Sequence, residues 1–466
     1  MCIRDRVQIV QNLKIFNTLN SQKEEFSPLD SDHIKLYACG PTVYNYAHIG
    51  NARMAVVFDT IVRTLRVLYP KVTYVSNITD IDDKIIDAAK EAGVEISAIT
   101  EKYTQIYNED MSRLNVLEPD VQPKATEYIP EMIELIIDLI EKDFAYEKDG
   151  HVLFHVPSYN NYGKLSNRNR EEQIAGSRVE VAPFKKDPSD FVLWKPSDDT
   201  QPGWDSPWGV GRPGWHTECS AMSEKTLGLP FDIHGGGRDL IFPHHENEIA
   251  QSCCSSANIN EPTSYAKYWM HNGFVTIEGE KMSKSLGNII LVRELTDLYH
   301  GEVIRLALLS SHYRQGLDWN EKVAHQANKL INKLYEIKDD LSEIEVSNSA
   351  SHDLNTISTL MDDLNTPGLI AELNKIVKEY NSSKEDRKFI KEKLTLIGSV
   401  LGILQDDKFN EISDELRKEV EKLILKRDTA KKDKDYEAAD SIREELSKLG
   451  IEIKDSSDGT VWNLKS

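Results

Sequence analysis

Cysteine is scarce in this sequence, with five residues among 466. They are Cys2, Cys39, Cys219, Cys253 and Cys254. An odd and sparse set of this kind does not build the disulfide framework that staples small secreted domains. The scarcity therefore excludes a disulfide-rich scaffold, and we expect free thiols or thiolates that bind a metal ion.

Long hydrophobic runs are also missing. No apolar stretch approaches the ~18 residues that a membrane span needs, and the opening residues have no apolar segment suited to a signal peptide. Hydrophobic residues make up 39% of the chain, which is typical of globular proteins rather than disordered ones. We therefore expect a cytoplasmic protein of about three domains, at roughly 150 residues each, without a membrane partner.

Basic residues are outnumbered, 56 against 77 acidic, which gives a net charge of -21. Taken alone, this balance argues against a nucleic-acid partner. Binding follows local patches, however, and the run from Arg417 to Lys434 holds eight Lys/Arg against four Asp/Glu. The run is either a solvated helix face or a phosphate-contacting surface, and the sequence leaves both interpretations open. The residues concerned are Lys426, Arg427, Lys431 and Lys432.

The patterns along the chain alternate between strand and helix. Residues 34–38 and 72–76 have the character of short strands, while residues 51–69 show one apolar helical face. Another helix begins near Asp82, and the alternation resumes after an interruption with a strand at 231–234 and a helix at 246–254. This order predicts an α/β fold with a Rossmann-type parallel sheet covered on both sides.

The interruption predicts an insertion into this domain, with an amphipathic helix carrying Ile129, Met132, Ile133, Ile136 and Ile140. After about Val292 the pattern is helical as far as Leu404, and a hairpin follows two charged helices at the C-terminus. We expect a helical bundle and then a small α+β C-terminal domain. The expected boundaries are 8–122 and 208–272 for the two halves of the sheet domain, 123–207 for a connective insertion, 273–325 for a loop region, 326–405 for the bundle and 406–466 for the last domain.

Two short motifs suggest nucleotide chemistry. The tetrapeptide His48-Ile-Gly-Asn51 stands where a strand gives way to a helix, and a helix start presents backbone N–H groups to phosphates. His48 and Asn51 add side-chain donors, and Gly50 leaves room for a flat base. Alone, this motif favours the simpler interpretation of an ordinary helix start.

The second motif, Lys281-Met-Ser-Lys-Ser285, lies on a loop after a probable hairpin. Lys281 and Lys284 flank Ser283, and their ammonium groups would neutralise charge that develops on a triphosphate. The alternative is an exposed basic loop. The two motifs occur together in this order, about 230 residues apart, which favours ATP binding.

The pair resembles the HIGH and KMSKS motifs of class I aminoacyl-tRNA synthetases, although Asn51 replaces the final His of HIGH. The resemblance implies that His48, Asn51, Lys281 and Lys284 act in catalysis. It also implies that Gly50 and Ser283 bind ATP, which carries Mg²⁺.

A metal site is a further hypothesis from the residues. His244 and Glu248 are four positions apart and would share a helix face, as His245 and Glu248, three apart, would also do. Cys39 and Cys219 would supply thiolates, but their spacing is too long to read as a local zinc motif. From spacing alone zinc remains one option among several.

Five longer stretches of the sequence narrow the resemblance to one family. They are "YACGPTVYNYAHIGNAR", "NITDIDDK", "GWHTECSAM", "FDIHGGG" and "FPHHENEIAQS", and they resemble cysteinyl-tRNA synthetases. The likeness runs from about Lys14 to the C-terminus and implies one zinc ion per chain, held by Cys39, Cys219, His244 and Glu248, with His245 as the alternative ligand. It implies the substrates L-cysteine, ATP and tRNA(Cys), and we expect a monomer.

Zinc would suit this substrate. Cysteine and serine differ by one atom, and a hydrophobic pocket rejects a hydroxyl isostere by only ~100-fold. Zinc binds a thiolate far more readily than an alcohol. The resemblance also places Gly40, Thr42, Thr79, Trp215 and Asp239 around the amino acid, although Thr79 has an alternative role as the cap of the helix that follows.

Two rival functions remain. The first is a cysteine ligase with a small amine as acceptor, of the mycothiol-pathway type, which lacks the C-terminal domain expected here. The second is a non-catalytic paralogue that binds tRNA or zinc. Pyrophosphate exchange with cysteine, with and without tRNA charging, separates the three.

Overall fold

The computed structural model describes residues 13–169, 172, 183–255, 261–283, 285–346, 353–382, 386–407, 409, 414–432, 435–448, 451–456 and 459–464. Cys2, Lys284, Lys434 and the polar break at 347–351 lie outside the described residues. Within these ranges, none of the helices combines the length and apolar character that crossing a membrane demands.

A four-stranded parallel sheet forms the centre of the molecule, in the order β10-β9-β3-β4. Its strands are β3 (Ile34–Ala38), β4 (Val72–Ser76), β9 (Phe231–Gly237) and β10 (Ala266–Asn272). The strands predicted at 34–38 and 72–76 are confirmed, and the one at 231–234 runs three residues further.

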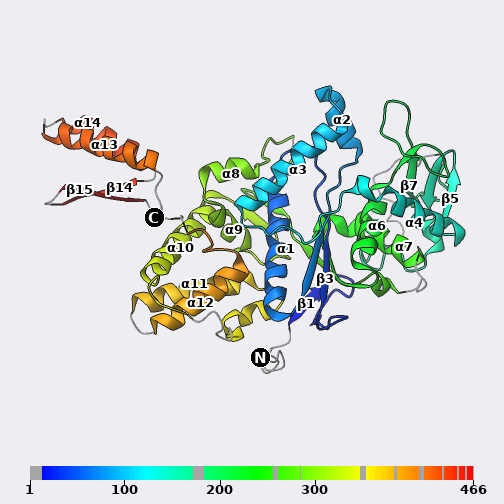
Figure 1. Ribbon diagram of the computed structural model, residues 1–466, viewed down its shortest axis with the longest axis horizontal. Helices are drawn as coiled ribbons and strands as arrows, with labels where there is room; N and C mark the ends of the chain where they lie inside the picture. Colours follow the sequence, from blue (N-terminus) through cyan, green and yellow to red (C-terminus); the bar gives the residue numbers. More distant parts are fainter. Residues whose placement is uncertain are drawn as a thin grey trace.

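The sheet has a different core on each face, because side chains alternate along a strand. Leu36 and Ala38 join the core on the side of α1 (Ile49–Leu68), while Tyr37 and Cys39 join the core on the opposite side. Helices α6 (Trp215–Leu227) and α7 (Glu246–Ser255) belong to that second core. The period of two along β3 therefore directs Cys39 toward these helices. Figure 1 shows α1 on one side of the sheet and α6 and α7 on the other.

The chain winds outward from the middle of the sheet in both directions. From β3 it passes through α1 to β4, and from β9 it passes through α7 to β10. The point between β3 and β9 is thus a topological switch, where crevices form at the carboxyl ends of parallel strands. Cys39 and Gly235 to Gly237 stand at this edge, so the fold itself directs a binding site there.

The predicted insertion contains more structure than its sequence suggested. Its helix α4 (Ile129–Glu141) is confirmed, although Ile133 and Ile140 are only half-buried. An antiparallel sheet, which we did not expect, follows in the order β5-β6-β7-β8. Its strands are β5 (Ala145–Lys148), β6 (His151–Phe154), β7 (Phe191–Pro196) and β8 (Gly211–Pro213), so it extends past the expected boundary at 207.

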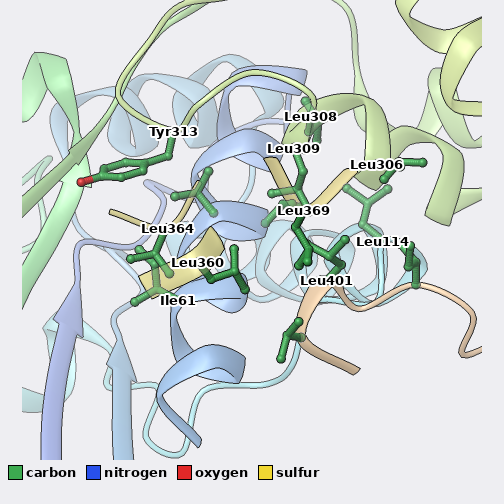
Figure 2. Close-up of a cluster of buried hydrophobic side chains, with 14 of the residues drawn as sticks. Ile61, Leu114, Leu306, Leu308, Leu309, Tyr313, Leu360, Leu364, Leu369 and Leu401 are labelled. Atoms are coloured by element: carbon green, nitrogen blue, oxygen red, sulfur yellow. The ribbon is translucent and has the colours of Figure 1, made fainter. Parts of the chain in front are cut away.

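Two helices, α2 (Asp83–Ala92) and α3 (Ile96–Arg113), follow β4. Farther along the chain, five helices contribute to the same core as α1, and α9 and α12 among them pack directly against it. They are α8 (Val292–Leu298), α9 (Gly301–Leu309), α10 (Glu321–Asp340), α11 (Thr366–Asn381) and α12 (Arg387–Leu401). Figure 2 shows part of this core, where Ile61 of α1 lies near Leu360 and Leu364.

The expectation of unbroken helix after Val292 is wrong at one place. Strand β13 (Leu317–Trp319) lies between α9 and α10 and pairs in parallel with β11 (Val275–Ile277). β11 also pairs with β12 (Glu280–Lys281), which confirms the hairpin before the lysine loop. A strand of three residues is too short to show an alternating pattern that would distinguish it from the helical sequence around it.

The chain begins with a hairpin, β1 (Lys14–Asn17) and β2 (Gln22–Glu25). It ends with α13 (Asp414–Lys432), α14 (Tyr436–Lys448) and the antiparallel pair β14 (Ile451–Ser456) and β15 (Gly459–Leu464). The fold is therefore the expected one, a parallel-sheet domain with an insertion, a helical bundle and a small α+β unit. That last unit stands apart from the rest in Figure 1.

Candidate metal centre and nucleotide site

Four residues that are distant in sequence meet at the switch point. Cys39 follows β3, Cys219 lies in α6, His244 lies in the turn before α7, and Glu248 lies in α7. All four are buried, and one ligand atom from each lies within 4.8 Å of the others. The metal ligands that the family resemblance implies are thus brought together by the fold.

The separations suit a tetrahedral ion. The Sγ atom of Cys39 is 3.7 Å from the Sγ of Cys219, 3.6 Å from Nε2 of His244 and 3.7 Å from Oε1 of Glu248. Zinc bonds of about 2.3 Å to sulfur and about 2.0 Å to nitrogen or oxygen would separate tetrahedral ligands by roughly 3.3–3.8 Å, the shortest value being that of a nitrogen–oxygen pair. Nε2 of His244 lies 2.9 Å from Oε1 of Glu248, which is somewhat closer.

In a second set of four residues the ligand atoms also lie within 4.8 Å of one another. The set consists of Cys39, His234, His245 and Glu248. Nε2 of His234 is 3.6 Å and Nε2 of His245 is 3.3 Å from the Sγ of Cys39. His245 was predicted as the alternative ligand, whereas His234 was not predicted as a ligand. The quoted phrase "FDIHGGG" places this histidine at a strand end, which was the available signal.

The outer partners of the histidines differ between the sets. A ligating histidine normally donates its second ring nitrogen to a neighbouring group. Nδ1 of His244 is 2.8 Å from Nδ1 of His216, and Nδ1 of His245 is 2.7 Å from Nε2 of His271. Among the described residues, Nδ1 of His234 has no hydrogen-bond partner.

Glu248 is held from its far side. Its Oε2 atom accepts a hydrogen bond from the Tyr265 hydroxyl at 2.8 Å and lies 3.3 Å from Nε2 of His234. Its Oε1 atom is the one near Cys39 and His244. His234 therefore serves as a partner of the carboxylate in the first set, where a ring N–H is what Oε2 requires.

The metal-free cluster is polarised. A hydrogen bond from Cys39 lowers the pKa of Cys219 to about 7, whereas burial raises the pKa of Cys39 well above its usual value. Burial lowers the pKa of His244, but the Glu248 carboxylate and the Cys219 thiol together outweigh burial and raise this pKa to about 10. Burial lowers the pKa of His234 to about 4. The first set thus contains Cys219, the thiol with the lowered pKa. A cation bound there would displace protons from the thiols and the imidazole.

Three residues expected around the amino acid lie beside this cluster. The backbone N–H of Thr79 donates to the Pro41 carbonyl at 3.0 Å, and Thr42 and Thr79 form an isolated parallel bridge. Gly40 donates its N–H to Oδ1 of Asn77, and a Cβ at Gly40 would stand 1.6 Å from the Asn77 carbonyl oxygen. Glycine is therefore required at position 40 by a close backbone approach.

The alternative role of Thr79 as a helix cap is wrong. The cap of α2 is Asp82, whose side chain accepts the Lys84 N–H. The Thr79 hydroxyl instead donates to Oε2 of Glu218, at 3.1 Å, and Thr79 is buried.

Trp215 and Asp239 complete the expected set at a more open position. The Trp215 ring is 40% exposed and stacks on His244 with ring centroids 4.2 Å apart. Asp239 lies on an exposed turn after β9, and its carboxylate opposes part of the pKa lowering that burial causes at His48. Trp215 thus contacts the cluster directly, while Asp239 interacts electrostatically with His48.

The start of α1 departs from the prediction of free backbone donors. Nδ1 of His48 accepts the N–H groups of Gly50 and Asn51, and Oδ1 of Asn51 accepts the N–H of His48. The N–H of Ile49 donates to the Ile290 carbonyl. The first turn is therefore capped, and Nε2–H of His48 and the Nδ2 amide of Asn51 are the donors that remain outside the cap.

Gly50 has close neighbours within the protein. A Cβ at this position would lie 3.0 Å from the His48 ring and 3.2 Å from Cε of Met282. Met282 belongs to the lysine motif, so this glycine lets the two motifs pack together. Gly235 is also a packing position, because an added Cβ there would lie 2.0 Å from the Phe58 ring.

Backbone bonds join the two motifs as well. In addition to the bond from Ile49 to Ile290, the Val292 N–H donates to the Ala47 carbonyl at 2.9 Å. Lys281 is exposed at the end of the hairpin, and the Ser283 N–H donates to Oδ1 of Asn288. The position of Lys284 lies outside the described residues.

The residues of the basic run near the C-terminus differ in their exposure to solvent. Lys426, Lys431 and Lys432 are exposed, whereas Arg427 is buried and donates to the Thr460 hydroxyl at 3.3 Å. A phosphate contact by Arg427 is therefore not supported, because its guanidinium helps to join α13 to β15.

Sequence comparisons agree along the chain. Residues 25–329 match the family described as the class I (C) tRNA synthetase catalytic domain, 352–405 match the DALR domain and 413–462 match the cysteinyl-tRNA ligase anticodon-binding domain. The cysteine–tRNA ligase of Parvibaculum lavamentivorans is 53% identical over 97% of this chain and 98% of its own length. That of Rhodospirillum rubrum is 51% identical over 97% and 99%.

Solved structures show the same fold at low identity. A Mycobacterium tuberculosis methionyl-tRNA synthetase in complex with methionyl-adenylate has a TM-score of 0.56 at 15% identity, over 79% of this chain and 89% of that one. An Agrobacterium radiobacter LeuRS in a ternary complex has a TM-score of 0.58 at 11% identity, over 81% and 84%.

Proposed function

Since the chain belongs to the cysteinyl-tRNA synthetase family of class I ligases, we propose that its buried cluster holds a zinc ion that selects L-cysteine for ATP-dependent activation. The chain is an ATP-dependent cysteine–tRNA ligase. It forms cysteinyl-adenylate and transfers the cysteine to the 3′ end of tRNA(Cys), releasing pyrophosphate and AMP. The single observation that carries the zinc proposal is the convergence of Cys39, Cys219, His244 and Glu248 at the switch point.

The donor set fits zinc. Two thiolates, one imidazole and one carboxylate match the sulfur, nitrogen and oxygen ligands that zinc accepts in four-coordinate sites. When bound, zinc supplies a soft Lewis acid that takes up the side-chain sulfur of cysteine as a thiolate and discriminates against the alcohol of serine.

The outer partners favour this set over the one with His234 and His245. His244 has His216 as a partner for its second ring nitrogen, while His234 lacks such a partner within the described part of the chain. The set with Cys219 also offers two thiolates in place of one, and Cys219 has the lowered pKa. A thiolate neutralises zinc better than a neutral imidazole.

The chain's own residues divide the remaining work. His48, through Nε2, and Asn51, through its amide, would donate hydrogen bonds to the ATP phosphates. Lys281 and Lys284 would stabilise charge on the α-phosphate as the carboxylate of cysteine attacks it, with Ser283 and Gly50 lining the ATP site and Mg²⁺ accompanying ATP. Gly40, Thr42, Thr79, Trp215 and Asp239 would enclose the amino acid.

The acceptor is tRNA rather than a small amine. The match to an anticodon-binding domain at residues 413–462 supports this choice over the mycothiol-type alternative. We place the protein in the cytoplasm, where charged tRNA is consumed, and as a monomer, because the domains expected for both steps lie on one chain. The six predicted domain boundaries stay a proposal.

Metal analysis combined with two activity assays tests the function. The purified protein should contain about one zinc per chain, support cysteine-dependent ATP–pyrophosphate exchange, and load labelled cysteine onto total tRNA. Serine should support neither reaction. Exchange without tRNA charging would point to the small-amine ligase, and absence of both reactions would point to a non-catalytic paralogue.

A further inference from the structure

Arg53 is a fully buried arginine in the second turn of α1 that the site described above does not use. Its Nη1 atom donates to the carbonyl oxygens of Phe274, at 2.7 Å, and Gly273, at 3.3 Å. Its Nη2 atom donates to those of Gln315, at 2.7 Å, and His312, at 3.3 Å. One guanidinium therefore contacts two chain segments that are separated by about forty residues.

These two segments lead into the sheet that carries the lysine loop. Phe274 directly precedes β11, and Gln315 stands two residues before β13. β11 and β13 pair in parallel, and β12, which ends at Lys281, pairs with β11. Arg53 thus forms hydrogen bonds to the segments just before both parallel strands. Lys281 is the last residue of β12, the third strand of this sheet.

The Arg53 guanidinium is unusual because it is a buried cation without a neighbouring carboxylate in the described part of the chain. Within the described residues, no carboxylate lies within ion-pair distance of Arg53. Burial lowers its pKa to about 10, so the side chain is still a cation at neutral pH. A buried cation without a counter-charge is costly unless dipoles replace the water it loses. Four carbonyl groups in a fork geometry provide that replacement, which a lysine matches only in part.

The loop before β13, which Arg53 contacts, is also held by other hydrogen bonds. The Tyr313 hydroxyl and the Arg314 guanidinium, in the loop that Arg53 holds, both donate to the buried carboxylate of Asp363, at 2.8 and 2.7 Å. Asp363 also accepts the Phe16 N–H. Figure 2 shows Tyr313 at the edge of the helical core. These bonds anchor the loop before β13, and Arg53 ties the start of β11 to that loop.

We propose that Arg53 is a positioning residue that sets Lys281 relative to His48 and Asn51 for adenylate formation. Arg53 stands two residues after Asn51 on the same helix, so it links the first turn of α1 to the sheet that carries Lys281. The inference rests on the proposed role of Lys281 in ATP chemistry. It adds no contact between Arg53 and substrate.

The first test compares variants by cysteine-dependent pyrophosphate exchange. Arg53→Met should lower kcat by about 10²-fold, the scale expected when a reacting group is displaced by ~1 Å. KM for cysteine and the metal content should stay unchanged, and Arg53→Lys should recover part of the rate. Arg66→Met is the matched control, because Arg66 lies on the same helix but pairs with Asp120 at the surface.

A double-mutant cycle with Lys281→Ala separates positioning from general structural damage. If Arg53 acts through Lys281, the Arg53 substitution should have little further effect once Lys281 is absent. Equal losses in both backgrounds would overturn the proposal, as would unchanged kcat in Arg53→Met.

Folding is checked by thermal unfolding. Other bonds persist at this corner, since Phe274 also accepts the Leu317 N–H, so the variants should fold. If Arg53→Met does not fold, Arg53→Lys enters the cycle in its place, with the same criterion. Absence of exchange in the unaltered protein would remove the proposed function itself, whereas additive losses in an active protein would remove only the role of Arg53.

Discussion

The two ends of the candidate site are built differently. The thiol cluster is buried on all sides, and its ligand atoms already stand at metal-binding separations. The nucleotide end joins a capped helix start to an exposed Lys281 on a hairpin. The first is set by the packing of the sheet core, and the second depends on a few backbone bonds and on Arg53.

The difference fits two separate demands. Discrimination between sulfur and oxygen requires a site that is formed before the substrate arrives. Stabilisation of phosphate charge requires groups that act where charge develops during the reaction. Substitutions at the cluster should therefore remove the metal and cysteine dependence together, while those at the nucleotide end should change the rate and leave the metal in place.

The largest effect should come from Cys39→Ser. Loss of one thiolate from a four-ligand site should abolish bound zinc and cysteine-dependent exchange, exceeding the roughly 10- to 100-fold loss typical of outer partners. Metal analysis and exchange assays measure both. Cys253→Ser, another buried thiol outside the cluster, is the control and should retain zinc. Full exchange in a metal-free Cys39→Ser protein would contradict the proposal.

The next effect should come from Lys281→Met. Removing one ammonium group that stabilises developing charge should lower kcat of exchange by about 10²-fold. Zinc content should remain one per chain, in contrast to Cys39→Ser. Loss of zinc together with activity would show that the two ends are not separable in the way proposed.

A smaller effect should follow from His216→Asn. His216 is the partner of His244, and loss of an outer partner typically weakens metal affinity roughly 10- to 100-fold. His271→Asn, which changes the partner of His245, should leave affinity nearly unchanged. Competition with a chelator measures both variants. The opposite ranking would favour the ligand set with His234 and His245.

The last prediction concerns the metal-free protein and the dependence of its stability on pH. Burial lowers the pKa of His234 to about 4 and that of His271 to about 3, whereas both ionise near 6.5 in an unfolded chain. The unfolded state therefore binds more protons below pH 6.5, and stability falls as pH falls. Two such groups contribute about 2.7 kcal/mol per pH unit between roughly pH 6 and 4.5.

Denaturant unfolding at several pH values measures this slope. His271→Asn should remove about half of this contribution, whereas His325→Asn, on an exposed face of α10, should leave the slope as it is. A slope that does not respond to His271→Asn would show that this imidazole is already protonated in the folded state.

Much of the fold was accessible from sequence because its elements follow simple periods. β3 and β4 are short apolar strands, and α1 has one apolar face. The antiparallel sheet of the insertion was not, since Trp194 and Trp204 lie in segments rich in proline and glycine whose pairing is set by tertiary contacts. β13 was hidden for a similar reason, because three residues have no readable period.

The site shows the same division. Cys39, Cys219, His244 and Glu248 could be named through family resemblance, yet only the fold brings Cys39 within 4 Å of three ligand atoms. The contacts that Thr79 and Gly50 make within the protein could not be foreseen. Each depends on a neighbour far away in sequence, Glu218 for Thr79 and Met282 for Gly50.

X-ray absorption at the metal edge of the purified protein tests the central claim most directly. The first ligand set predicts two sulfur ligands and two nitrogen or oxygen ligands on one zinc ion. A single sulfur ligand would instead identify the set of Cys39, His234, His245 and Glu248. A protein active in cysteine-dependent exchange without any bound metal would contradict both assignments.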